Sequence, residues 1–336
     1  MDPVIPFPHR QYAHCESGVV AALLTHYGLA ISEPLVFGIS GGLTFAYIPF
    51  IKITNLPIIS YRMFPHAIIQ GIQKRLGIRF RTHTYRDPAR AHGELVTLLS
   101  EGRVVGLQTS VYWLPYFPDE MRFQFNAHNL IVYGMEDGQF LVSDPIADHL
   151  VRIAPADLEN ARFAKGTLAP RGFLYYPERV PSSIAMEEPI RKAIRKTAQM
   201  MLYAPVPLIG VKGIRTLAGR IERLRRHPDQ RYVRNFLGHI VRMQEEIGTG
   251  GGGFRFMYAA FLQEAGETLG LPVLKEASLR MTEAGDLWRT FALACARACK
   301  RKGDPVDFTA IADLARRCAD FEEQVFRMLL RMEWTA

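Results

Sequence analysis

A segment rich in proline, serine and charge, residues 177–188, divides this 336-residue chain into halves with different hydrophobic patterns. Before it, short apolar runs alternate with turn signals and a few helical stretches, which is typical of an α+β fold. After it, apolar residues recur every three or four positions, which is typical of packed helices. We therefore predict an α+β domain over residues 1–180 and an all-helical domain over residues 181–336.

The order of elements follows from the same patterns. Helices are predicted over residues 15–29, 65–76 and 88–100, and strands over 79–84, 104–109, 128–133, 139–143 and 172–176. Asp137 and Gly138 predict a tight hairpin between two of these strands. In the second half, helices are predicted near 189–203, 211–226, 229–247, 254–268, 273–301 and 307–332. The fold class is thus α+β with an antiparallel sheet, followed by an all-α domain.

Sequence features exclude several classes of protein. The uncharged stretch 34–51 is broken by prolines and glycines, so it does not predict a membrane-spanning helix. The N-terminus lacks the basic and apolar regions of a secretory signal, and we expect a cytoplasmic protein with no membrane partner. Four cysteines are too few for a disulfide framework. No metal-ligand spacing and no dinucleotide fingerprint occurs, so we expect no metal site and no bound cofactor.

The net charge of +8 belongs to the second half of the chain. Residues 181–336 hold 25 Lys and Arg against 18 Asp and Glu, whereas residues 1–180 hold 16 against 15. Ten basic residues gather at the start of the helical half: Arg191, Lys192, Arg195, Lys196, Lys212, Arg215, Arg220, Arg223, Arg225 and Arg226. Solvated helix faces explain most such runs, and an acidic partner is the functional alternative. Nucleic acid is not expected, because no helix-turn-helix, zinc or base-stacking motif accompanies the charge.

Cys15 is the first candidate for chemistry. It stands at the predicted start of a helix, where unpaired backbone amides and the helix dipole stabilise a thiolate. This is a suitable position for a nucleophile, although a buried cysteine that only packs explains it equally well. Cys295 and Cys299 are spaced i,i+4 on an Ala-rich segment, where packing as small apolar side chains is the better interpretation.

A predicted hairpin adds two further residues. His128 opens its first strand, and Asp144 follows the end of the antiparallel neighbour, so their side chains are expected to lie close at one edge of the sheet. A general base and the group that orients it could occupy these positions. A capping histidine and an Asp-Pro turn explain each residue taken singly.

These three residues and their surroundings resemble a known family. The hairpin, with a histidine at a strand start and Asp-Pro sixteen residues later, is similar to that of papain-like cysteine enzymes, especially the bacteriocin-leader-processing peptidases. Residues 14–47, HCESGVVAALLTHYGLAISEPLVFGISGGLTFAY, resemble the N-terminal domain of the butirosin biosynthesis protein H family. In that family a Cys/His/Asp domain is often followed by a helical domain of unassigned function. Its founding activity is acyl transfer from an acyl carrier protein thioester to the amine of an aminoglycoside.

The resemblance implies a role for each residue. Cys15 would accept the acyl group, His128 would act as general base and acid, and Asp144 would orient the imidazole. The Cys15 amide is one natural oxyanion donor. Peptidases of this fold commonly place a glutamine six residues before the cysteine; here His9 holds that place, and Gln11, four residues before, is the candidate. The implied donor is a phosphopantetheine-linked thioester, presented by an acidic acyl carrier protein or as coenzyme A, and the implied acceptor is a small molecule.

Other residues are weaker candidates for binding substrate. Gly41 and Gly42, with Tyr47 after them, indicate a backbone that passes close to substrate or forms a plain tight turn. Trp113 lies in SVYWLPYF, residues 110–117, which fits a loop lining an acyl channel or a hydrophobic plug. Gly251 and Gly252 belong to a glycine run that could approach a phosphate or pantetheine arm, or serve as a flexible connector.

Three functions therefore remain open at the level of sequence. The first is a cysteine-dependent acyltransferase of specialised metabolism that makes an amide or ester. The second is a peptidase, amidase or thioesterase, which would use the same triad with water as acceptor. The third is a noncatalytic scaffold that binds a carrier protein while Cys15 only packs. The helical domain could dock a carrier protein, complete the active site or form a homodimer.

Overall fold

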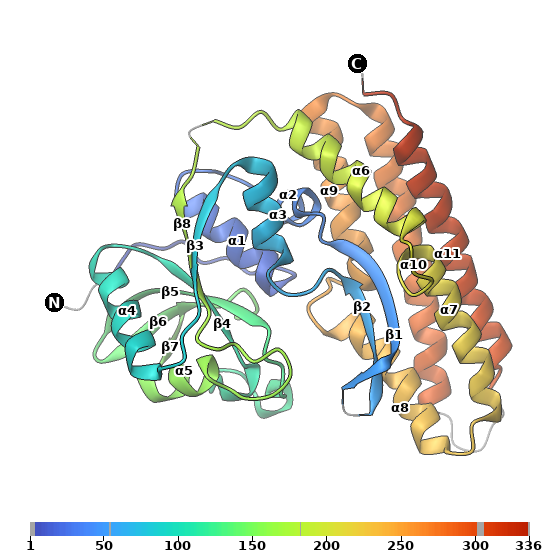
Figure 1. Ribbon diagram of the computed structural model, residues 1–336, viewed down its shortest axis with the longest axis horizontal. Coiled ribbons are helices and arrows are strands. Elements are labelled where there is room, and N and C mark those ends of the chain that lie inside the picture. The colour runs from blue at the N-terminus through green and yellow to red at the C-terminus, as the bar shows by residue number, and fades with distance from the viewer. Residues whose placement is uncertain (1–3, 54, 182, 301–305, 335–336) are drawn as a thin grey trace. The chain divides into compact units, whose positions relative to one another are not determined.

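The structure is a computed structural model that describes residues 4–53, 55–181, 183–300 and 306–334. It consists of two compact units, each described here by itself. The first unit comprises Met1–Val36 and Ile68–Ile184, and the second comprises Phe37–Ala67 and Ala185–Ala336. Figure 1 shows a sheet flanked by helices in the first unit and long helices beside a hairpin in the second.

The first unit is built on a six-stranded antiparallel sheet of order β3-β8-β4-β5-β6-β7. Its strands are β3 (Arg79–His83), β4 (Val105–Thr109), β5 (His128–Glu136), β6 (Gln139–Ser143), β7 (Val151–Ile153) and β8 (Leu174–Arg179). Its helices are α1 (Cys15–His26), α3 (Ala67–Leu76), α4 (Pro88–Ser100) and α5 (Pro155–Arg162), with α2 (Glu33–Ser40) spanning the division between units. Two short 3-10 helices, η1 (Val111–Trp113) and η2 (Asp119–Met121), lie between β4 and β5.

The core of the first unit explains the placement of α1. Residues 15–24 of this helix are all buried, and the helix packs against β4 and β5. A helix that is apolar around most of its circumference must be covered on all sides. On the sheet, Leu107, Leu130, Val132 and Phe140 form a buried cluster with apolar residues of α4. The first residue of α1 is therefore fixed against the start of β5.

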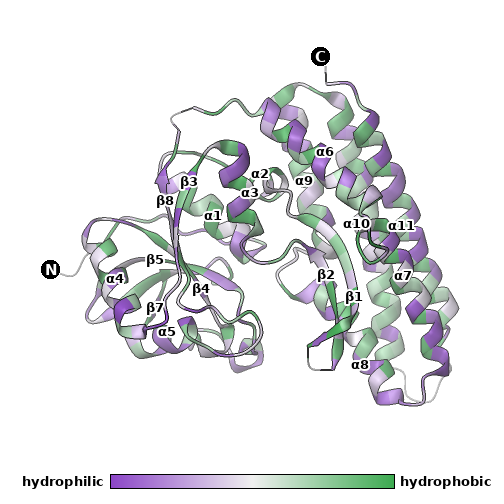
Figure 2. Ribbon diagram, viewed as in Figure 1, coloured by the Kyte–Doolittle hydropathy of each residue, from purple (hydrophilic) through white to green (hydrophobic). Residues whose placement is uncertain are grey.

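The second unit joins two distant parts of the chain. It contains the antiparallel strands β1 (Leu43–Ile53) and β2 (Leu56–Arg62). Its helices are α6 (Glu187–Tyr203), α7 (Gly210–Arg223), α8 (Gln230–Val241), α9 (Arg255–Leu269), α10 (Pro272–Lys300) and α11 (Phe308–Arg331), with η3 (Leu224–Arg226), the π-helix η4 (Arg242–Glu246) and η5 (Gly252–Phe254) between them. Figure 2 shows hydrophobic and hydrophilic faces along α6, α7 and α11. Those apolar faces form the core of this unit.

The α+β class, the antiparallel sheet and the helical character of residues after 184 are confirmed. The predicted division at residue 180 was wrong for residues 37–67, which belong with the helices. The reason is packing: Phe45 stacks on Trp288 with ring centroids 5.7 Å apart, and Tyr61 meets Trp288 edge-on at 5.2 Å. A Cβ on Gly38 would lie 2.0 Å from the Phe261 ring. The second unit is therefore not all-helical.

Several elements differ from the predictions in their bounds. The helix predicted over 15–29 ends at His26, and the helix predicted over 229–247 changes to a π-helix after Val241. The hairpin β1–β2 and the helices α2 and α5 were not predicted. Residue 301, the predicted end of a long helix, and residues 1–3 lie outside the described part. Within the described part, no helix has both the length and the apolarity that crossing a membrane requires.

Candidate active site

Cys15 is the first residue of α1, and a buried carboxylate shapes the turn that precedes it. Glu33 accepts hydrogen bonds from the backbone N–H groups of Ala13 at 2.9 Å and His14 at 2.8 Å. The Ser17 hydroxyl donates to the same carboxylate at 2.9 Å. Burial raises the pKa of Glu33, and these donors act in the opposite direction. The result is a rigid entry into the helix, with the Cys15 thiol 6% exposed.

The sulfur of Cys15 lies beside the start of β5. Its Sγ is 3.8 Å from the Ala127 carbonyl oxygen and 3.9 Å from Nδ2 of Asn129. Tyr175 on β8 donates its hydroxyl to Oδ1 of Asn129 at 2.9 Å, which fixes the orientation of the amide. Asn129 was missed at the level of sequence. Its one signal was a polar residue at the start of an otherwise apolar strand.

His128 and Asp144 form the contact that the hairpin predicted. Nε2 of His128 lies 2.7 Å from Oδ2 of Asp144, and the Asp144 side chain is completely buried. The antiparallel register pairs Ile131 with Ser143, which brings the beginning of β5 to the end of β6. The alternative of an Asp-Pro turn also holds, because the Ile146 N–H donates to Oδ1 of Asp144 at 2.9 Å. Asp144 therefore shapes the turn and holds the imidazole.

Two aromatic residues of the loop after β4 complete the surroundings of this pair. The Tyr116 hydroxyl donates to Oδ2 of Asp144 at 2.8 Å, and burial together with the Asp144 charge raises the pKa of Tyr116. Tyr116 thus stays a neutral donor. The Phe117 ring meets the His128 imidazole edge-on, with centroids 5.9 Å apart. Neither aromatic residue was singled out as a site residue from the sequence.

Charge on the imidazole decides what this arrangement can do. Burial alone would lower the pKa of His128, because it penalises the imidazolium. The Asp144 carboxylate and the neighbouring Cys15 outweigh that effect and raise the pKa of His128 to about 10. Because Nε2 faces Asp144, the other ring nitrogen is left for the cysteine. An imidazolium next to a thiol at a helix start favours the thiolate, which is the reactive form.

Gln11 lies in the segment that leads into α1, and its exposed side chain contacts the turn that follows Asp144. Its Nε2 donates to the Ile146 carbonyl at 3.3 Å, and the Tyr12 N–H donates to the Pro145 carbonyl at 2.9 Å. His9 bonds to the same region, with Nδ1 2.8 Å from the Ser143 hydroxyl. The segment before Cys15 is thus anchored on the turn after β6. The role of Gln11 as an oxyanion donor stays a prediction.

The weaker candidates do not share one location. Trp113 lies in η1 of the first unit and is 41% exposed, whereas Val111, Leu114 and Phe117 of the same stretch are core residues. Gly41, Gly42, Tyr47, Gly251 and Gly252 all belong to the second unit.

The predicted glycines of the second unit have structural roles. Gly41 and Gly42 end α2, with the Gly42 N–H bonded to the Phe37 carbonyl at 3.0 Å, which is the plain turn considered above. The Gly252 N–H donates to the Glu245 carboxylate at 3.2 Å. A Cβ on Gly252 would lie 2.9 Å from the Phe256 ring, so the run is closely packed. Tyr47, by contrast, lines a pocket.

The arrangement of His, Cys, Asp and Glu side chains bears on metal binding. Among the residues that the structure describes, no group of three or more of these side chains is arranged to hold a metal ion. Cys295 and Cys318 are free and fully buried, and burial raises the pKa of each thiol. These thiols pack as apolar side chains.

A cysteine at a helix start, a histidine opening a strand and an aspartate after the neighbouring strand have the arrangement typical of papain-like cysteine enzymes. Two family models match the chain. Residues 14–145 match the family described as Butirosin biosynthesis protein H, N-terminal, and residues 156–329 match the Domain of unknown function (DUF4872). The chain belongs to the butirosin biosynthesis protein H-like family, in which these two domains follow one another.

Comparison with individual proteins adds one similar structure. It is a crystal structure described as a C39-like peptidase from Bacillus anthracis, which is 14% identical to this chain with a TM-score of 0.38. The match covers 54% of this chain and 100% of that chain. No curated protein matches the sequence.

Proposed function

We propose that this chain is a cytoplasmic, cysteine-dependent acyltransferase of specialised metabolism. It would move an acyl group from an acyl carrier protein or coenzyme A thioester, through an acyl-enzyme on Cys15, to an amine or hydroxyl acceptor. The observation that carries the proposal is the buried contact between His128 and Asp144 beside the Cys15 thiol. The family to which the chain belongs favours transfer over hydrolysis, because its founding activity is acyl transfer.

The first half of the proposed reaction forms the acyl-enzyme. The Cys15 thiolate attacks the thioester carbonyl carbon, and the negative charge moves to the carbonyl oxygen, where the Cys15 N–H and Gln11 are the candidate donors. The carbon–sulfur bond to the donor then breaks. The His128 imidazolium gives its proton to the departing thiolate, so that a free thiol leaves. Asp144 keeps the ring in place throughout, because it accepts from Nε2.

The second half returns the enzyme to its starting state. His128, now neutral, takes a proton from the acceptor amine or hydroxyl as that group attacks the acyl carbon. The tetrahedral intermediate collapses to an amide or ester and releases Cys15 as a thiolate beside the recharged imidazolium. Water in place of the acceptor would give hydrolysis by the same residues.

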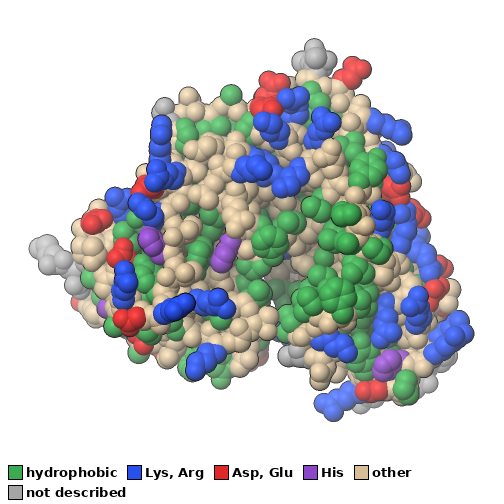
Figure 3. Space-filling model, in the orientation of Figure 1, with side chains coloured by type: hydrophobic (Ala, Val, Ile, Leu, Met, Phe, Trp, Pro, Cys, Tyr) green, Lys and Arg blue, Asp and Glu red, His purple; other side chains and the backbone are tan. Residues whose placement is uncertain are grey.

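The donor is proposed to be presented by an acidic acyl carrier protein. Lys and Arg side chains are numerous along α6 and α7 of the second unit, as Figure 3 shows. Part of this charge is neutralised within the chain: Lys192 pairs with Glu188 at 3.0 Å, and Arg215 pairs with Asp320 and Glu323. The residues that remain can attract an acidic surface, mainly by raising the rate of encounter.

The test is intact-protein mass spectrometry after mixing the chain with a panel of acyl-carrier and acyl-coenzyme A thioesters. We expect a mass increase equal to the acyl group on the wild type and on Cys299→Ala, the control for a half-buried thiol, and none on Cys15→Ala. The melting temperature of Cys15→Ala should stay close to that of the wild type. Release of the adduct by amines in preference to water would support transfer, and release by water alone would identify a hydrolase. Equal thioester consumption by Cys15→Ala would exclude the proposed nucleophile.

A further inference from the structure

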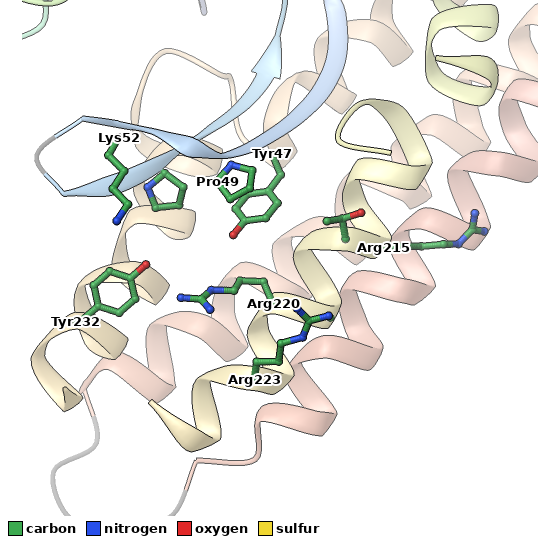
Figure 4. A pocket seen from close by; sticks show the side chains of 10 residues that line it. Tyr47, Pro49, Lys52, Arg215, Arg220, Arg223 and Tyr232 are labelled. Atoms are coloured by element: carbon green, nitrogen blue, oxygen red, sulfur yellow. The ribbon is translucent and has the colours of Figure 1, made fainter. Parts of the chain in front are cut away.

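The second unit contains a pocket of about 530 Å³ formed by β1, β2, α7 and α8. This volume lies within the range typical of small-molecule sites, roughly 300–1,000 Å³. Tyr47, Pro49, Pro57 and Tyr232 provide its aromatic and apolar walls. Lys52, Arg220 and Arg223 contribute positive charge, and no carboxylate is among the lining residues. Figure 4 shows these side chains around the opening.

The polar groups of the pocket converge. In Figure 4 the hydroxyl groups of Tyr47 and Tyr232, the amine of Lys52 and the guanidinium of Arg220 point into one space. The Tyr47 residue is only 3% exposed, and its hydroxyl is directed toward the pocket in Figure 4. Burial raises the pKa of Tyr47, while the charge of Arg220 acts against this, so the two groups are electrostatically coupled. A hydroxyl directed into a pocket lined by positive charge is a donor available to an anionic ligand.

The charges of the pocket are not compensated by the chain. Within the described residues, Lys52, Arg220 and Arg223 form no ion pair with a carboxylate, whereas Arg215 points away and pairs with Asp320 and Glu323. Arg220 and Arg223 are three residues apart on α7, so their like charges repel. The Arg220 guanidinium and an ammonium with two hydroxyl donors match an oxygen-rich anion, Arg223 adds positive charge at the pocket wall, and guanidinium groups bind phosphate oxygens bidentately.

We propose that this pocket binds the phosphate group of a small organic phosphate ester. Arg220, Arg223 and Lys52 would hold the phosphate oxygens, and the Tyr47 and Tyr232 hydroxyls would donate to them. The organic part would lie along the rings of Tyr47 and Tyr232 and against Pro49, because the pocket is larger than a phosphate group needs. The inference goes beyond the proposed acyl transfer and does not depend on it, since it concerns binding alone.

The test measures binding by isothermal titration calorimetry on the full chain, with 4′-phosphopantetheine, pantetheine and inorganic phosphate as probes. The first two differ only in the phosphate, so their affinity ratio reports on the phosphate site. We expect the wild type to bind 4′-phosphopantetheine at least about tenfold more tightly than pantetheine. Arg220→Gln should abolish this preference, and Arg226→Gln, on an exposed arginine outside the pocket, should keep it.

A second pair of variants closes the pocket without removing a charge. A Cβ on Gly219 of α7 would meet nothing within 4 Å, and Gly219 lines the pocket. Gly219→Phe should fill the space and remove the preference for 4′-phosphopantetheine, whereas Gly219→Ala should retain it. Melting temperatures of all variants would show that the fold is kept.

The relative affinities of the probes decide whether the pocket binds an organic phosphate ester. If inorganic phosphate binds as tightly as 4′-phosphopantetheine and with the same dependence on Arg220, the pocket binds phosphate alone, and the assignment to an organic phosphate ester is overturned. Equal binding of the two pantetheine probes, no binding of either, or an unchanged preference in Arg220→Gln would overturn the proposal. Binding of poly-glutamate without any of the phosphate probes would assign the pocket to an acidic protein and overturn it equally.

Discussion

Asp144→Asn is the substitution that tests the proposed active site most directly. It keeps the shape of a completely buried side chain but removes its negative charge. In the wild type, Oδ2 accepts from both His128 and Tyr116, and Oδ1 accepts from the Ile146 N–H. An asparagine whose oxygen takes the place of Oδ2 retains two of these bonds. Its amide group then faces the Ile146 N–H, so one partly buried donor loses its acceptor.

The size of the effect follows from the imidazole. Raising the pKa of His128 from its ordinary 6.5 to about 10 corresponds to about 5 kcal/mol of preference for the imidazolium. Burial alone acts in the opposite direction, so without the Asp144 charge the ring is neutral at pH 7. For a raised histidine pKa, the stabilisation is complete below the unfolded value near 6.5 and is lost as the pH rises through about 10. Asp144→Asn should therefore cost about 3–5 kcal/mol of unfolding free energy at pH 7, and less near pH 10.

The assay is the pH dependence of Cys15 alkylation by iodoacetamide, followed by intact mass, with Cys15→Ala reporting the background of the other three cysteines. The wild type should react faster than Asp144→Asn at neutral pH, since the His128 imidazolium favours the reactive thiolate. In Asp144→Asn the profile should move to higher pH, and acyl transfer should fall by about 10²-fold or more. Asp148→Asn, at an exposed position, is the matched control. Superimposable profiles for Asp144→Asn and the wild type would refute the coupling between the three residues.

Two further predictions concern the second unit. Arg255 and Glu322 form a completely buried ion pair with N–O distances of 2.7 and 3.0 Å. Glu322→Gln should therefore lower the free energy of unfolding by about 3–5 kcal/mol in chemical denaturation. A decrease below about 1 kcal/mol would contradict an essential charge pair. The exposed neighbour Asp320→Asn, which loses only a surface pair with Arg215, is the control. Gly38→Ala should lower the melting temperature, corresponding to about 1–3 kcal/mol, because its Cβ would lie 2.0 Å from the Phe261 ring, whereas Gly219→Ala in open space should not. An unchanged melting temperature for Gly38→Ala would mean that the Phe261 ring moves aside freely.

The contact between His128 and Asp144 and the place of Cys15 at a helix start could be predicted because local signals determine them. Asp137 and Gly138 both have positive φ, at 50° and 72°, as a two-residue hairpin turn of this kind requires. The turn fixes the pairing of β5 with β6, and the pairing in turn fixes the distance between His128 and Asp144. The start of α1 at Cys15 was equally local, since it depends on the apolar run that follows. Both predictions, the His128–Asp144 contact and the start of α1, used only residues within about twenty positions of one another.

The residues that hold Asp144 and Asn129 in place could not be predicted in this way. Tyr116 reaches Asp144 from a loop 28 residues away, and Tyr175 reaches Asn129 from a strand 46 residues away. No local sequence pattern predicts the loop conformation or the strand order β8-β4-β5. The same holds for the pocket of the second unit, where Tyr47 and Arg220 come from distant parts of the sequence. Tyr47 was singled out, but for a different reason.

The hairpin β1–β2 shows why the break near residue 180 predicted only part of the domain structure. A linker shows where the chain passes from one unit to the next. It does not show that an earlier segment, here residues 37–67, packs with the later unit. Phe45 and Tyr61 are buried against Trp288, and the Arg255 guanidinium lies 5.6 Å from the centroid of the Tyr61 ring. Residues 185–336 alone would leave Trp288 and Phe261 without these neighbours and would expose a large apolar surface. The helical half is therefore completed by a segment inserted into the sequence of the first unit, and the pocket bounded by Tyr47 and Arg220 exists only because of that insertion.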